Sequence, residues 1–268
     1  MIQLVCLDVD GTLVGPTGEV TDAVWEAVDV ALARGQHLAL STARGAFGSS
    51  LEIAQRLDPS GWHVFHAGGA VVHADGRVKT HQLDQDVVGR CCEISDDLGQ
   101  ILELYSAKRY AVDSDAPLAV EHAALMGVPF EARPRSTLLN SDEDIVRVQF
   151  VSDVAAAPAV MNALEVVAAT VTSATSPVMP GAVFISVTQP GITKATGVSA
   201  IADALGLTVA DVMMVGDGHN DLPALEAVGH AVAMGNAEQA VLDVATHRVA
   251  SVVDDGVVEA LELSMRLG

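Results

Sequence analysis

Residues 7–13, with the sequence LDVDGTL, carry two aspartates two positions apart, directly after an apolar run. The run 2–7 is typical of a buried strand, and alternation along a strand turns Asp8 and Asp10 to one side. Neighbouring carboxylates repel each other, and a divalent cation would neutralise them. One carboxylate could then act as a nucleophile while the other transfers a proton. A surface Asp-x-Asp-Gly turn would give the same pattern, so this segment alone leaves both interpretations open.

Three further groups of polar residues lie where predicted strands end or predicted helices begin. They are Thr42 after the run 37–40, Lys194 in the first turn of a helix predicted to residue 205, and Asp217, Asn220 and Asp221 after the run 211–215. The carboxyl ends of parallel strands meet at one edge of a sheet, so we expect these groups to converge with Asp8. Together they would counter negative charge from several directions, which phosphoryl transfer requires.

The two ends of the chain alternate strands with helices, which predicts a parallel sheet covered on both faces. Thr21 is expected to cap the first helix, and Gly35 to end it. The predicted strands of these ends are residues 2–7, 37–40, 62–65, 70–73, 77–80, 211–215 and 230–233, and helices are predicted at 194–205, from about 237, and at the C-terminus.

The middle of the chain has a different pattern, which predicts an inserted domain at residues 83–187 between two parts of one core, 1–82 and 188–268. Asp84 is expected to cap a long helix that continues to about Tyr105. The other predicted elements are strands at 109–113, 145–151, 170–176 and 183–188 and helices at 118–126 and 158–168. This mixture of strands and helices is typical of an α+β domain.

The composition excludes several classes of partner. The net charge of −21 repels nucleic acid and anionic membranes, so neither is expected to bind. No apolar stretch is long enough and free enough of charge to span a bilayer, which predicts a cytoplasmic protein. Cys6, Cys91 and Cys92 have no metal-ligand spacing and are expected to be reduced. We expect a monomer or a small homo-oligomer.

With these motifs in order, the chain resembles the haloacid dehalogenase-like (HAD) hydrolase superfamily, and within it the Cof-type class IIB phosphatases. Residues 8–12 are similar to its first motif, Thr42-Ala43-Arg44 to its second, Lys194 to its third and residues 216–221 to its fourth. The segments 232–237 and 254–257 are similar to the end of Cof-type chains. The resemblance implies an α/β fold: a doubly wound (Rossmann-like) parallel-sheet core with an inserted α+β cap domain.

The resemblance also implies a role for each matching residue. Asp8 would attack phosphorus and form an aspartyl phosphate, and Asp10 would act as acid and then as base. Mg2+ would be held by Asp8, the main-chain carbonyl of Asp10 and Asp217, with Asp221 acting directly or through water. The phosphate-binding residues would be Thr42, Lys194 and Asn220, helped by backbone amides near Val9 and Ala43.

Two positions depart from the superfamily pattern. Ala43 stands where the second motif usually has glycine, and Gly68-Gly69-Ala70 stands where Asn-Gly-Ala is common. The second departure removes a polar side chain near the leaving group, which affects the preference for substrate. Residues that select the substrate are expected in the cap, near 110–114 and 179–183.

The motifs and the resemblance together predict a magnesium-dependent phosphatase, and the resemblance implies small phosphorylated metabolites, above all sugar phosphates, as its substrates. The alternatives are a phosphomutase or phosphotransferase with the same nucleophile, a phospho-acceptor signalling protein, and an inactive binding protein. The signalling alternative is disfavoured by the large insertion and by Asp8 and Asp10 on the first strand. The complete motif set disfavours the inactive one.

Overall fold

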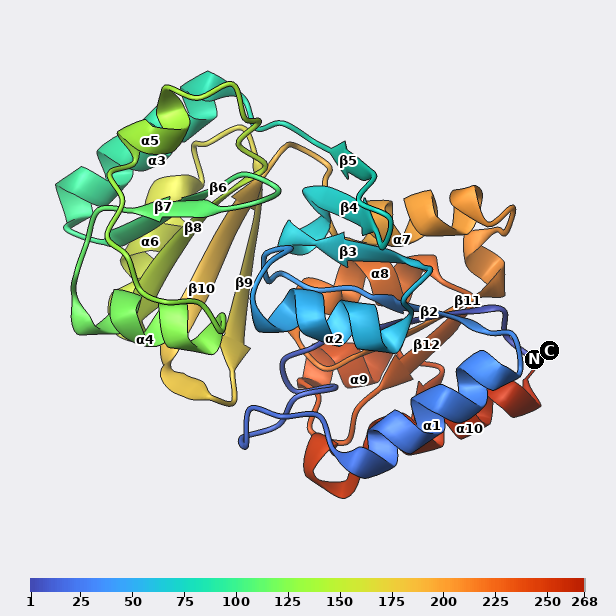
Figure 1. The fold of residues 1–268 in the computed structure, drawn as a ribbon. Coiled ribbons are helices and arrows are strands. Elements are labelled where there is room, and N and C mark those ends of the chain that lie inside the picture. The colour runs from blue at the N-terminus through green and yellow to red at the C-terminus, as the bar shows by residue number, and fades with distance from the viewer. Residues whose placement is uncertain (268) are drawn as a thin grey trace.

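A parallel five-stranded sheet in the order β13-β12-β11-β1-β2 lies at the centre of one half of the molecule (Figure 1). The structure is a computed structural model and describes residues 1–267. The strands are β1 (Leu4–Leu7), β2 (His37–Leu40), β11 (Val212–Gly216), β12 (His230–Ala233) and β13 (His247–Arg248). β1 pairs with β11 on one side and with β2 on the other, so β1 is the middle of the sheet.

Alternating side chains of β1 explain why both faces of this sheet are covered. Val5 and Leu7 belong to one apolar cluster, which includes residues of α1 (Asp22–Ala33), α2 (Ser49–Leu57) and α10 (Gly256–Arg266). Leu4 and Cys6 belong to another, with residues of α7 (Lys194–Ala204), α8 (Leu222–Ala227) and α9 (Gln239–Val244). Helices on both faces of a parallel sheet define the doubly wound class that the sequence predicted.

A short antiparallel sheet lies next to β2. It consists of β3 (Trp62–Phe65), β4 (Ala70–His73) and β5 (Val78–Thr80), in that order. A parallel bridge between Ser41 and Val64 joins β3 to the continuation of β2. The turn after β3, η1 (His66–Gly68), carries left-handed backbone at all three of its residues.

The other half of the molecule is an antiparallel sheet in the order β7-β6-β8-β10-β9 (Figure 1). Its strands are β6 (Ile101–Tyr105), β7 (Tyr110–Val112), β8 (Arg147–Asp153), β9 (Thr170–Ser176) and β10 (Met179–Thr188). Its helices are α3 (Gln85–Leu98), α4 (Pro117–Leu125), α5 (Ser136–Leu139) and α6 (Ala157–Leu164). These elements form the α+β part of the predicted fold class.

The two faces of the antiparallel sheet differ in chemistry. Leu102 and Leu104 of β6, with Val148 and Phe150 of β8, pack in an apolar cluster that includes α3 and α6. The alternate positions of these strands hold Glu103, Tyr105, Arg147 and Gln149, all of them buried. Since neighbouring residues of a strand point to opposite faces, one face is apolar and the other polar.

One prediction for this region is wrong. The helix expected from Asp84 to about Tyr105 ends at Leu98, and residues 101–105 form β6 instead. In segment 101–105, ILELY, apolar and polar side chains alternate around Glu103. The segment pairs with β8, and this long-range pairing decides its conformation. Asp84 does cap α3, accepting a hydrogen bond from the amide of Asp86 at 2.8 Å. Thr21 likewise caps α1.

None of the helices in residues 1–267 combines the length and the apolar composition needed to cross a membrane.

Candidate active site

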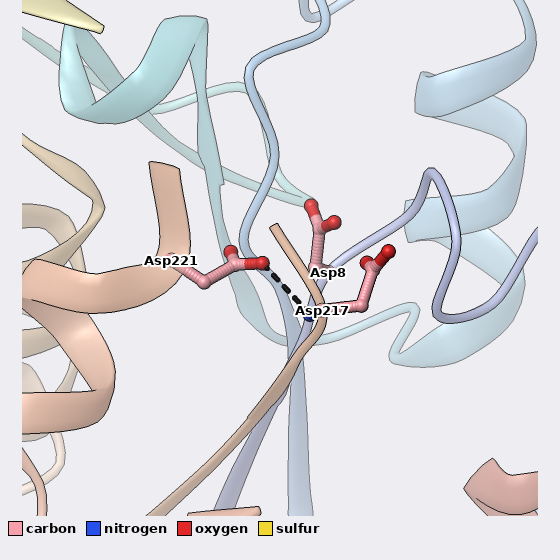
Figure 2. Close-up of side chains that lie close together, drawn as sticks. All are labelled: Asp8, Asp217 and Asp221. Atoms are coloured by element: carbon pink, nitrogen blue, oxygen red, sulfur yellow. Dashed lines mark hydrogen bonds between the residues drawn. The ribbon is translucent and has the colours of Figure 1, made fainter. Parts of the chain in front are cut away.

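Three aspartates from two neighbouring strands meet at the carboxyl edge of the parallel sheet. Asp8 follows β1, and Asp217 and Asp221 follow β11, its neighbour in the sheet (Figure 2). One carboxylate oxygen from each lies within 4.8 Å of the others. Asp8 and Asp221 are almost completely buried, at 5% and 0% exposure. The predicted convergence of these carboxylates is therefore present in the structure.

Lys194 supplies a positive charge between two of these carboxylates. Its ammonium donates hydrogen bonds to Asp8 Oδ1 at 2.7 Å and to Asp221 Oδ1 at 2.6 Å. Thr193 and Thr196 form a capping box that fixes the start of α7, and so the place of Lys194. Burial alone would lower the pKa of Lys194, but Asp221 and Asp8 raise it above its ordinary value.

One ammonium does not balance three carboxylates, of which Asp8 and Asp221 are buried and Asp217 is partly buried. Burial, followed by repulsion from Asp221, raises the pKa of Asp8 to about 7. Burial and the charge of Asp8 raise the pKa of Asp217 to about 8. A divalent cation with a preference for oxygen ligands would offset this excess of negative charge, so the cluster fits a divalent metal ion.

Asp217 is held in place by residues of the first motif and of the loop after β12. Thr12 Oγ1 donates to Asp217 Oδ1 at 3.1 Å, and Asn236 Nδ2 donates to Asp217 Oδ2 at 3.2 Å. Gly11 has φ +85°, and a Cβ there would lie 2.1 Å from Asp217 Oδ2. Only glycine therefore permits this close approach. Thr12 lies in the first motif and Asn236 in the segment 232–237, but the sequence alone did not identify either as a positioning residue.

Asp221 accepts more hydrogen bonds than the other two carboxylates of the cluster, Asp8 and Asp217. Its Oδ2 accepts hydrogen bonds from the backbone amides of Asp217 and Gly218, each at 3.1 Å, and its Oδ1 accepts from Lys194. Figure 2 shows the bond to the Asp217 amide as a dashed line. Asp221 therefore fixes both the acidic loop and the lysine.

Asp10 has partners from both halves of the molecule. Arg44 donates from Nε to Oδ2 and from Nη2 to Oδ1, both at 2.8 Å. Ser176, at the end of β9, donates from Oγ to Oδ1 at 2.7 Å. Burial would raise the pKa of Asp10, but Arg44 and Ser176 lower it below its ordinary value. The sequence did not indicate that Ser176 would reach the first motif.

A cavity of about 180 Å³ contains most of the predicted site residues. Asp8, Asp10, Thr42, Ala43, Asn220 and Asp217 all line it. Val9 differs, since its side chain packs in the apolar core and its carbonyl accepts the amides of Thr12 and Val14. Only the backbone of Val9 can therefore serve the site.

The antiparallel sheet and α4 close the cavity from the other side. Their contribution includes His122, Met126, Arg147, Gln149, Ser176 and Phe184. Neither segment expected to select the substrate, 110–114 or 179–183, contributes to this lining. Tyr110 and Val112 pack instead in an apolar cluster beside Phe47 and Met126. The sequence did contain an indication of the polar lining: the charged residues Glu103 in β6 and Arg147 in β8 interrupt otherwise apolar strands.

The departure from Asn-Gly-Ala has a local structural reason. Gly68 has φ +103°, and a Cβ there would lie 2.1 Å from the carbonyl oxygen of Thr193. The turn after β3 packs directly against the residue that precedes Lys194. A side chain at position 68 would therefore disturb the lysine, and the polar group common in the superfamily has no room.

Comparisons with known proteins agree with this geometry. A family profile described as haloacid dehalogenase-like hydrolase matches residues 5–261. The chain belongs to this family and is therefore a hydrolase.

Individual relatives match over nearly the whole chain. The Bacillus subtilis protein named 5-amino-6-(5-phospho-D-ribitylamino)uracil phosphatase YitU is 27% identical over 97% of this chain and 96% of its own length. A crystal structure of a haloacid dehalogenase-like hydrolase from Bacteroides thetaiotaomicron superposes with a TM-score of 0.84 at 24% identity, covering 98% of this chain and 99% of the other. BT1666 from the same organism, described among phosphatases of the superfamily, gives 0.80 at 26% identity, with 100% and 96% covered.

Proposed function

We propose that this hydrolase is a magnesium-dependent phosphatase that acts on small phosphorylated metabolites, with sugar phosphates as the first candidates, through an aspartyl phosphate on Asp8. One observation carries the proposal: Asp8 Oδ1 is fixed by Lys194, while Oδ2 has no hydrogen-bond donor within the described chain. An oxygen with a free lone pair at the wall of a cavity is what a nucleophile requires. The named phosphatases among the relatives support this reaction class.

In the proposed mechanism, the reaction proceeds in two displacements at phosphorus, the first by Asp8 and the second by water. Asp8 Oδ2 attacks phosphorus, the bond from phosphorus to the ester oxygen breaks, and Asp10 gives its proton to the departing alkoxide. Asp10 then takes a proton from water, the water oxygen attacks phosphorus, and the bond to Asp8 breaks to release phosphate. Lys194, Thr42, Asn220 and the backbone amides near Val9 and Ala43 would bind the phosphoryl oxygens.

Arg44 and Ser176 bear on the second of these displacements. Both stabilise the ionised form of Asp10, which is the form that accepts a proton from water. To protonate a leaving group, Asp10 must carry a proton and so must loosen its bonds to Arg44. The bonds from Arg44 and Ser176 therefore support the proposed role of Asp10 as base in the second displacement.

A magnesium ion would be held by Asp8, Asp217 and the carbonyl oxygen of Asp10, with Asp221 acting directly or through water. When bound, it neutralises charge on the transferring phosphoryl group. We propose residues 83–187 as the cap and residues 1–82 and 188–268 as the core. Closure of the cap over the cavity would exclude water and select the leaving group.

The test is a screen of phosphate esters, with and without Mg2+, using the unaltered chain and Asp8→Asn. We expect phosphate release that depends on Mg2+ and falls by about three orders of magnitude or more in Asp8→Asn. Glu19→Gln, an exposed change in a nearby loop, is the matched control and should keep full activity. Substantial turnover by a folded Asp8→Asn protein would exclude the nucleophilic role.

A phosphotransferase is distinguished by its product. We expect inorganic phosphate from a simple sugar phosphate without a bisphosphate activator. Transfer to a second sugar in place of release would instead favour the mutase.

A further inference from the structure

Arg147 is a buried arginine without a carboxylate partner. It lies in β8 with 2% of its surface exposed. Within residues 1–267 no carboxylate oxygen lies within 4.0 Å of its guanidinium, whereas Arg44, the other arginine of the cavity, pairs with Asp10. A buried charge is costly unless it is paired. Burial accordingly lowers the pKa of Arg147.

The guanidinium of Arg147 is held rigidly but keeps unused donors. Its Nη1 donates to Gln149 Oε1 and to Ser186 Oγ. Its plane lies over the ring of Tyr105, with the central carbon 4.0 Å from the ring centre. The Nε hydrogen is buried and has no acceptor in the described chain. The side-chain hydrogen bonds of Arg147 in residues 1–267 both start from Nη1, so Nη2 donates none there. Three of its five N–H groups therefore have no acceptor.

Glu103, the carboxylate bound to Tyr105 and Gln149, is already occupied by other donors. Glu103 Oε2 accepts from Tyr105 at 2.5 Å and from Gln149 at 3.2 Å. Its Oε1 lies 2.9 Å from Nδ1 of His122. Burial would raise the pKa of Glu103, but His122, Tyr105 and Arg147 lower it below its ordinary value. Glu103 thus orients the ring and the amide that hold Arg147 without contacting the guanidinium.

Arg147, Gln149 and His122 line the same cavity as Asp8 and Asp10. The carboxylates lie at the core side of this cavity and the three polar side chains at the cap side. A phosphate bound against Asp8 would therefore direct the rest of its ester toward the cap side. The same cavity therefore contains the proposed site of the transferring phosphoryl group, at Asp8, and the fixed guanidinium of Arg147.

We propose that Arg147 binds an oxyanion on the leaving group, so that the preferred substrates are phosphate esters carrying a carboxylate or a second phosphate. Planar, preoriented N–H donors match the paired oxygens of such groups. Gln149 positions Arg147 through its hydrogen bond, and the ring of Tyr105 packs against the guanidinium. This inference rests on the proposed phosphatase function and narrows its substrate class.

The first test uses the unaltered protein with Mg2+ and compares matched esters. One pair is 3-phosphoglycerate and glycerol 3-phosphate, which differ by a carboxylate. The other compares fructose 1,6-bisphosphate with each of its monophosphates. We expect kcat/KM to be about 10- to 100-fold higher for the anionic member of at least one pair, the size of a charge-assisted hydrogen bond. The pair that shows the preference identifies the source of the oxyanion.

The second test uses Arg147→Met, with Arg109→Met as control. Arg109 lies in the same half of the molecule, pairs with Glu143 and does not line the cavity. In Arg147→Met we expect KM for the preferred ester to rise about 10-fold or more with little change in kcat. The reason is that the variant loses a contact that is equally strong in the enzyme–substrate complex and in the transition state. The neutral ester should be affected much less. Arg109→Met should retain the preference.

The results separate this inference from the function on which it rests. If no ester is hydrolysed, the phosphatase proposal fails. If esters are hydrolysed but the anionic member is preferred in neither pair, only the assignment of Arg147 is overturned. Equal losses on neutral and anionic esters in a folded Arg147→Met protein would also overturn it. If that variant does not fold, the comparison on the unaltered protein still decides the question.

Discussion

Arg44 donates hydrogen bonds to both carboxylate oxygens of Asp10, from Nε to Oδ2 and from Nη2 to Oδ1, each at 2.8 Å. The pair joins the second motif to the first, and both residues line the cavity. Burial would raise the pKa of Asp10, but the charge of Arg44 and its hydrogen bonds lower it below 3.8. The stability contributed by this pair is therefore complete above about pH 4 and is lost as the pH falls through the lowered pKa.

Arg44→Met is expected to move the activity of the enzyme toward higher pH. Without the guanidinium, burial dominates and the pKa of Asp10 rises. Asp10 then becomes protonated at a higher pH and can no longer accept a proton from water. In saturating Mg2+, which would keep Asp8 ionised, we expect the low-pH limb of the kcat profile to shift upward by about one pH unit or more, measured by phosphate release from pH 4 to pH 9.

Arg56→Met is the matched control for this prediction. Arg56 also donates two hydrogen bonds to one aspartate, Asp29, but this pair is exposed and distant from the cavity. Its loss should leave the pH profile unchanged, because exposed ion pairs contribute little. An unshifted profile in Arg44→Met would show that Arg44 does not control Asp10.

The order of the motifs predicted which residues meet at the edge of the sheet. Asp8, Lys194 and Asp217 lie up to 209 positions apart in the chain, yet parallel pairing of β1 with β11 brings them together. That convergence follows from topology alone, since loops after neighbouring parallel strands share an edge. Local pattern therefore sufficed for the core of the site.

The orientation of the individual side chains could not be predicted in the same way. The pairing of Arg44 with Asp10 and the approach of Ser176 from the cap depend on how two sheets pack, and no periodicity records that. The polar face of β6 and β8 was visible in principle, because Glu103 and Arg147 interrupt apolar strands at alternate positions. The expectation of a helix through residues 101–105 concealed it.

Binding of Mg2+ should strengthen as the pH rises. The pKa of Asp8 is raised to about 7 and that of Asp217 to about 8, so protons compete with a metal ion below these values. The folded protein holds these protons more tightly than the unfolded chain does. The free energy of unfolding without metal should therefore decrease as the pH rises from about 4 to about 8. Added Mg2+ should then raise Tm more at pH 8.5 than at pH 6.

Calorimetric titration in buffers of different ionisation enthalpy measures the protons released when Mg2+ binds. We expect release at pH 7 and little at pH 9. Asp217→Asn should remove most of the stabilisation by Mg2+, whereas Asp211→Asn, at an exposed aspartate before β11, should retain it. A gain in Tm that is the same at both pH values would contradict the assignment of these carboxylates as ligands.

Thr12→Val should weaken metal binding without altering the carboxylates themselves. Thr12 donates to Asp217 Oδ1 at 3.1 Å, and this bond orients the carboxylate toward the cluster. Loss of such a supporting bond typically costs about 10- to 100-fold in metal affinity. Valine preserves the shape of the side chain at this buried position. The Mg2+ concentration that gives half-maximal activity measures the effect.

Thr17→Val serves as the control for Thr12→Val. Thr17 is exposed in the loop after the first motif, and its hydroxyl accepts only the amide of Glu19, at 3.4 Å. Its replacement should leave the magnesium requirement unaltered. If both variants needed the same Mg2+ concentration as the unaltered protein, the bond to Asp217 would have no part in metal binding.

Lys194→Met should destabilise the metal-free protein in a manner that depends on pH. The ammonium donates to Asp8 and Asp221, so its loss leaves two buried carboxylates without a counter-charge. Breaking a buried ion pair in this way costs about 3–5 kcal/mol. The loss should be largest near pH 8 and smaller near pH 5, because the pKa of Asp8 is raised to about 7 and its protonation then removes part of the uncompensated charge. Urea unfolding followed by the fluorescence of Trp25 and Trp62 measures the free energy of unfolding at each pH.

The comparison that decides this prediction is between Lys194→Met and Lys79→Met. Lys79 is exposed in β5, where its ammonium lies 5.2 Å from the ring centre of Trp62. Its loss should cost less than about 1 kcal/mol at either pH. In Lys194→Met, Mg2+ should restore part of the lost stability at pH 8, since a dication can replace the missing charge. A destabilisation independent of both pH and Mg2+ would mean that Lys194 acts through packing, and that the charge balance inferred for the cluster is wrong.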